Sequence, residues 1–191
     1  MAFNDKNRDK GGLVGLAVLC GVLQLAVAPY VALGNGRANF AMVFSALIAM
    51  LVGGRRGVIC GFLSGLFFDL CTTGAIGVMA FCLTVSSFVL GGEERNRLSG
   101  DFGAAVMSFA VAAFFVSLGY HFSMLLLGQA DGIIDVLVFR TLPTTLLTVV
   151  GFLPFAYHYS RTHVTGAGMV SGGQHGRRGA ARGEMYVGRK R

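Results

Sequence analysis

Residues 57–77 read GVICGFLSGLFFDLCTTGAIG, an apolar segment that directly follows the arginine pair Arg55 and Arg56. Steps of four along this segment place a set of small residues and one acid on one face of a helix. This set, called the glycine stripe below, comprises Gly57, Gly61, Gly65 and Asp69. Glycines spaced in this way let a second helix approach closely in lipid. The stretch therefore predicts a closely packed membrane helix, whose neighbour belongs either to this chain or to a partner.

The composition of the whole chain supports a membrane environment. Of the 191 residues, 54% are hydrophobic and only 13% are charged, whereas a soluble domain carries about 25% charged residues. The net charge of +7 is concentrated after residue 160, where seven Lys or Arg residues face one acid, Glu184. We therefore predict an all-α integral membrane protein with a basic C-terminal tail.

The apolar segments predict a bundle of about six transmembrane helices, because roughly 20 apolar residues are needed for each crossing. They are residues 12–33, 38–54, 57–71, 78–90, 102–127 and 133–157. The first segment is long enough to span, so we interpret it as a helix rather than as a cleaved signal peptide. Residues 133–139 lie at the interface, re-enter the membrane or form the outer end of a tilted helix, and the sequence leaves these alternatives open.

The distribution of basic residues predicts the orientation. With six crossings and a cytoplasmic N-terminus, fourteen Lys or Arg residues fall on the inner side, and two, Arg37 and Arg140, on the outer side. Positive charge is retained on the cytoplasmic side of membrane proteins, so both termini are expected there. The predicted parts are a cytoplasmic N-terminal segment (1–11), a six-helix transmembrane domain (12–157) and a basic, Gly-rich, disordered cytoplasmic tail (158–191).

Basic residues at the inner surface are candidates for contact with anionic lipid headgroups, at about 1 kcal/mol for each. They are Arg55, Arg56, Arg177, Arg178, Arg182, Arg189, Lys190 and Arg191. A tail that is only solvated is the alternative. The tail lacks the interleaved aromatic residues on which bases stack, so we expect no nucleic acid partner.

The predicted orientation also brings three ionisable residues to one level near the outer surface. These polar pairing candidates are Asp69, His121 and Arg140. Ionisable residues inside a membrane usually pair or face a cavity. A structural ion pair between Asp69 and Arg140, contact with the outer headgroups, a ligand or transport site, and a partner-binding role are the alternatives.

Motifs of enzymatic chemistry are not found in the sequence. It contains no HExxH, GxSxG or GxxxxGK[ST] motif, and no DxxDG pair that could hold a metal for lipid transfer. The four cysteines form no CxxC pair and belong to no His/Cys cluster. We therefore expect a protein that is not an enzyme, with no catalytic residues, no cofactor and no metal.

Two stretches resemble the bacterial rod shape-determining MreD family. Residues 61–70 read GFLSGLFFDL and are followed by TTGAIG at 72–77, while the last helix contains RTLPT at 140–144 and LPFAY at 153–157. The similarity extends over roughly residues 12–160. The last helix has threonines at 145 and 148 where the family pattern leads us to expect an asparagine.

The resemblance implies a non-enzymatic, multi-pass protein of the bacterial cytoplasmic membrane that takes part in cell-wall elongation and cell shape. Its implied partners are a bitopic MreC-like membrane protein, the peptidoglycan synthases of the elongation complex and, indirectly, an actin-like filament. The glycine stripe would then contact the single membrane helix of the bitopic partner. The alternative function is the substrate-binding membrane component of a vitamin-type transporter, for which Gln24 and the threonines of the last helix would add polar groups to a pocket.

Overall fold

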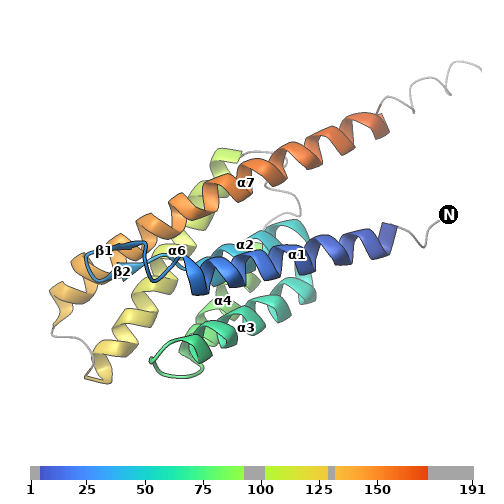
Figure 1. The fold of residues 1–191 in the computed structure, drawn as a ribbon. Helices are drawn as coiled ribbons and strands as arrows, with labels where there is room; N and C mark the ends of the chain where they lie inside the picture. The colour runs from blue at the N-terminus through green and yellow to red at the C-terminus, as the bar shows by residue number, and fades with distance from the viewer. Residues whose placement is uncertain (1–4, 93–101, 129–131, 172–191) are drawn as a thin grey trace, which may run out of the picture.

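The computed structural model describes residues 5–92, 102–128 and 132–171 (Figure 1). These residues form six α-helices, a short antiparallel hairpin and a π-helical turn. The elements are α1 (Asp5–Ala26), β1 (Ala32–Leu33), β2 (Gly36–Arg37), α2 (Phe40–Leu51), α3 (Gly54–Cys71), α4 (Val78–Gly92), α6 (Phe102–Leu126), η1 (Asp135–Thr141) and α7 (Leu142–Ser171). The predicted helical fold is confirmed, with the helices in the predicted order.

Helix α2 is the centre of the bundle. It has 12 residues, which at 1.5 Å per residue is about 18 Å, well short of a ~30 Å hydrocarbon core. All of its residues from Phe40 to Met50 are buried, because α1, α3, α4 and α7 pack around it. The chain turns out of α2 at Gly53 and Gly54, which have positive φ angles of 61° and 57° that only glycine adopts readily.

The β1–β2 hairpin docks on the start of α7 because of a proline. Pro143 has no N–H, so the carbonyl of Phe139, four residues earlier, lacks its usual helical donor. The backbone N–H of Asn35 in the hairpin donates to this carbonyl at 3.2 Å. Gly36 completes the contact, since a Cβ at this position would lie 2.6 Å from the backbone nitrogen of Thr144. The hairpin is thereby held against α7.

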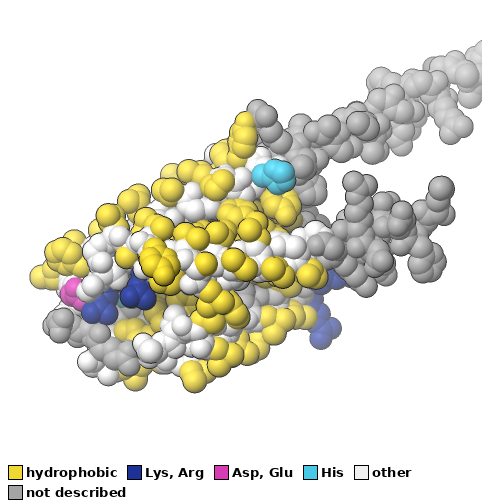
Figure 2. Space-filling model, viewed as in Figure 1, with side chains coloured by type: hydrophobic (Ala, Val, Ile, Leu, Met, Phe, Trp, Pro, Cys, Tyr) yellow, Lys and Arg dark blue, Asp and Glu magenta, His cyan; other side chains and the backbone are white. Residues whose placement is uncertain are grey.

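The face of the bundle seen in Figure 2 carries many hydrophobic side chains. Large hydrophobic side chains are exposed along each long helix, for example Val18, Phe62, Phe88, Phe115 and Val150. Among the described residues, two helices are long and apolar enough to cross a membrane, Phe102–Leu126 and Asp135–Tyr159. Shorter apolar helices extend over Gly12–Ala26, Phe40–Leu51 and Val78–Gly92.

The helix bounds differ from the predicted ones at both ends of the chain. α1 begins at Asp5 within the charged segment and ends at Ala26 rather than at residue 33, because Pro29 disfavours a helical residue before it. α7 continues to Ser171, beyond the predicted boundary at 157, since a helix can extend past the apolar run that crosses the membrane. Residues 133–139 are helical and lead through η1 directly into α7.

The two ends of the bundle are formed by different segments (Figure 1). The N-terminal end of α1, the turn between α2 and α3, and the C-terminal end of α7 lie at one end. The hairpin, the turn between α3 and α4, and η1 lie at the opposite end, which is called the hairpin end below. This arrangement brings polar side chains from six segments of the chain together at the hairpin end.

Candidate functional site

The glycine stripe is covered by helices of the same chain. A Cβ on Gly57 would lie 3.1 Å from the Cα of Ala49 in α2, and one on Gly61 would lie 2.8 Å from the carbonyl oxygen of Leu83 in α4. Gly65 is the tightest of the three against a neighbouring main chain, because its Cβ would lie 2.5 Å from the Cα of Ala80. All four residues of the stripe are buried.

The predicted alternative for this stripe, a contact with the membrane helix of a partner protein, is therefore wrong. The face is already filled by α2 and α4, and a second helix cannot occupy the same space. The contacts of the three glycines lie within the chain, between α3 and its neighbours α2 and α4. The sequence could not decide between the two alternatives, because a glycine face that meets a neighbour in the same chain has the same spacing as one that meets another protein.

Asp69 holds the start of α4. Its side chain is 1% exposed and accepts backbone N–H groups from Gly77 at 2.8 Å, Met79 at 3.2 Å and Ala80 at 3.1 Å. The first N–H groups of a helix have no partner within the helix, and a carboxylate is favoured at this positive end. Asp69 is thus a capping residue supplied by the preceding helix, and it fixes α4 on α3.

The predicted pairing of Asp69 with Arg140 is wrong, because the two residues have other partners. Nε of Arg140 donates to Oδ2 of Asp135 at 2.7 Å. These two residues are five positions apart in η1, the separation that the backbone hydrogen bonds of a π-helix connect. The acid that compensates this arginine is therefore local, whereas Asp69 is compensated by main-chain N–H groups.

The buried start of α2 is also capped by side chains, but these are neutral. Asn39 accepts the N–H of Met42 at 3.0 Å, and Oε1 of Gln24 in α1 accepts the N–H of Phe40 at 2.8 Å. The hydroxyl of Thr148 in α7 accepts the N–H of Asn39 at 3.1 Å. Sequence reasoning missed Asn39, although a residue of this type before an apolar run is a helix-start signal.

A cavity of about 440 Å³ opens among these groups at the hairpin end. Its polar lining comes from α1, the hairpin, the turn after α3, α6, η1 and α7. The polar cavity is defined by Gln24, Arg37, Thr72, His121, Arg140 and Thr144. The structure thus brings two of the pairing candidates, His121 and Arg140, into one site. Asp69 is absent from the lining, because its oxygens face the start of α4.

His121 is half-buried, and its Nδ1 has no hydrogen-bond partner in the described part of the chain. The ring of Tyr120 packs against it with the centroids 5.5 Å apart. A buried polar atom without a partner is unusual in a protein. Its place in the lining of the polar cavity makes it a candidate for contact with a bound molecule.

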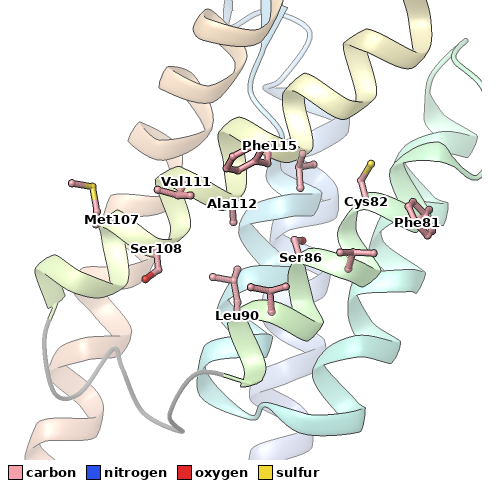
Figure 3. A pocket seen from close by; sticks show the side chains of 12 residues that line it. Phe81, Cys82, Ser86, Leu90, Met107, Ser108, Val111, Ala112 and Phe115 are labelled. Atoms are coloured by element: carbon pink, nitrogen blue, oxygen red, sulfur yellow. The ribbon is translucent and has the colours of Figure 1, made fainter. Parts of the chain in front are cut away.

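A second concave feature is an apolar groove between α4 and α6, with a volume of about 610 Å³ (Figure 3). Its rim consists of exposed side chains, Phe81, Val85 and Val89 on α4 and Met107, Val111 and Phe115 on α6. Its floor contains the small residues Cys82, Ser86, Ser108 and Ala112. This combination, called the α4–α6 groove below, was not predicted.

The lipid-contact candidates fall into two groups. Arg55 and Arg56 are exposed in the first turn of α3, at the end of the bundle opposite the polar cavity. The candidates of the tail, from Arg177 to Arg191, lie outside the described residues. Within the described residues, no group of three or more His, Cys, Asp or Glu side chains could hold a metal ion.

The buried polar caps, the closely packed glycines and the apolar outer surface together define a helical membrane protein. The model of the family described as rod shape-determining protein MreD matches residues 11–160. This match covers more than half of the chain, so the protein belongs to the MreD family, whose role is in rod-shape determination. The predicted resemblance is confirmed. No curated protein and no solved structure matches the chain.

Proposed function

We propose that this protein is a non-enzymatic scaffold of the cell-wall elongation machinery, held in the bacterial cytoplasmic membrane by six crossings. Both termini face the cytoplasm in this proposal. The N-terminal end of α1 and the C-terminal end of α7 lie at the same end of the bundle, which supports an even number of crossings. The excess of basic residues in the segments at that end supports the orientation.

The observation that carries the scaffolding role is the α4–α6 groove. In lipid, helices associate through close packing rather than through the hydrophobic effect, and small residues at the interface favour it. The groove has small residues along its floor and apolar side chains at its rim, with Phe81 70% and Met107 68% exposed. On each helix the lining extends over nine residue steps, which is roughly 14 Å.

The occupant that we propose is the single membrane helix of an MreC-like bitopic protein, the partner that the family resemblance implies. Two helical turns or more of such a helix would contact the groove over this length. The scaffold would then connect this partner to the peptidoglycan synthases of the elongation complex and, indirectly, to an actin-like filament. Anionic lipids would contact Arg55, Arg56 and the basic tail.

The test is co-purification of the MreC-like partner with variants that fill the groove. Ala112→Leu and Ser108→Leu place bulky side chains on its floor and are expected to reduce recovery of the partner at least tenfold. Gly15→Leu is the control, because nothing lies within 4 Å of a Cβ at this position on α1. Unchanged recovery with normally expressed groove variants would count against this interface. Normal rod shape after depletion of the protein would count against the shape-determining role.

The family match favours this role over the transporter-type alternative. That alternative needs several polar groups converging on one pocket, and the polar cavity contains such groups. A pocket of this kind is compatible with a scaffold that also binds a ligand.

A further inference from the structure

We infer that the polar cavity binds a phosphate group carried by a small molecule or by a lipid headgroup. The volume of about 440 Å³ lies within the range of ~300–1,000 Å³ that is usual for small-molecule sites. The lining combines apolar walls with convergent polar groups, which is the composition expected of a binding site rather than of a packing defect.

The charges that line the cavity are positive. Arg37 and Arg140 contribute to it, and none of its described lining residues is Asp or Glu; because Asp135 compensates Arg140, the excess positive charge is that of Arg37. The two described acids nearest in the fold are engaged elsewhere, Asp69 by the N–H groups of α4 and Asp135 by Arg140. In a site with low-dielectric walls this uneven distribution attracts an anion.

The start of α2 adds to this positive potential. Helix N-termini carry roughly half a positive charge, and Ala38 and Asn39 at the start of α2 line the cavity. The first turn of α2 contains no acidic residue, and its caps from Gln24 and Thr148 are neutral. The start of α4 differs, because the negatively charged carboxylate of Asp69 accepts a backbone N–H there.

Two groups in the lining are available to contact a ligand. The guanidinium of Arg37 makes no hydrogen bond or ion pair within the described part of the chain, and the residue is exposed. Nδ1 of His121 is buried without a partner there. The planar guanidinium matches the geometry of phosphate oxygens and binds them with two parallel hydrogen bonds. A phosphate in the cavity would therefore give Arg37 a partner.

The experiment is native mass spectrometry of the full chain purified in detergent, titrated separately with a short-chain phosphatidylglycerol and with glycerol 1-phosphate. The wild type is expected to retain at least one of the two. Retention of the lipid alone identifies a headgroup site, and retention of glycerol 1-phosphate identifies a site for a free phosphate ester. Retention of neither overturns the proposal.

Arg37→Gln is the decisive variant, because the side chain has no structural partner to lose. It is expected to raise the dissociation constant about tenfold, the effect of losing one charge-assisted contact. Arg55→Gln is the matched control at the other end of the bundle and should leave the constant for glycerol 1-phosphate unchanged. Equal weakening by both variants would indicate nonspecific attraction and overturn the site, and so would unchanged binding by Arg37→Gln together with Arg140→Gln.

Discussion

Asp69 in α3 and Ala80 in α4 are joined by a hydrogen bond of 3.1 Å between a carboxylate oxygen and a backbone N–H. Gly65, one turn before Asp69, faces the Cα of the same Ala80. Close approach of the two helices and capping of the second therefore depend on each other. Without the glycine, the start of α4 could not come within reach of the carboxylate.

Replacement of Asp69 by alanine is expected to lower the free energy of unfolding by about 2–4 kcal/mol. The change leaves buried N–H groups of α4 without their acceptor, and such groups are costly inside a protein. Thermal or denaturant unfolding in detergent measures the effect. Asp69→Asn keeps one acceptor oxygen and should lose less, so equal loss in both variants would contradict the capping role.

Replacement of Gly65 by alanine is expected to destabilise the bundle by about 1–3 kcal/mol, because the new methyl group would overlap backbone atoms of Ala80 that cannot rotate away. The same unfolding assay measures this loss. Gly15→Ala is the control, since a Cβ there meets nothing within 4 Å and alanine favours a helix. Similar stability of the two variants would mean that α3 and α4 are less closely packed than the structure shows.

The number and order of the helices could be predicted because each is an apolar run that ends at glycines, arginines or a proline. The central position of α2 in the bundle could not be predicted. A helix buried among others and a helix that faces lipid are both apolar, since lipid tails are as apolar as leucine side chains. The composition of residues 40–51 therefore does not distinguish the two positions.

The partners of the polar residues were beyond prediction for a related reason. The sequence favoured a pairing of Asp69 with another charged side chain, Arg140, because it shows which side chains are present but not which backbone groups lie near them. Its partners are backbone N–H groups, which every residue but proline carries. The acceptor for the N–H of Asn35 likewise exists because Pro143 leaves the carbonyl of Phe139 free, a relation between segments more than 100 positions apart.

Two threonines on α7 offer a matched test of the capping of α2. The hydroxyls of Thr145 and Thr148 both donate to the carbonyl four residues earlier, at 2.8 Å and 2.6 Å. Only that of Thr148 also accepts the N–H of Asn39. Thr148→Val should cost about 1–3 kcal/mol of unfolding free energy by leaving this buried N–H unpaired, whereas Thr145→Val should change it by less than ~0.5 kcal/mol.

The ion pair of η1 predicts which charges are energetically coupled. Asp135 and Arg140 are both about one-fifth exposed, at 23% and 21%, so solvent screens their attraction in part. A double-mutant cycle with Asp135→Asn and Arg140→Gln should give a coupling of about 0.5–1 kcal/mol in unfolding free energy. High salt should reduce this coupling.

The corresponding cycle for Asp69 and Arg140 should give no coupling beyond the error of about 0.5 kcal/mol, because Asp69 bonds to the main chain of α4 and Arg140 to Asp135. A charge swap, Asp69→Arg with Arg140→Asp, should therefore be no more stable than the single Asp69→Arg variant, since an arginine at position 69 presents donors to the donors of α4. Recovery of stability in the swapped protein would show that the two charges face each other after all.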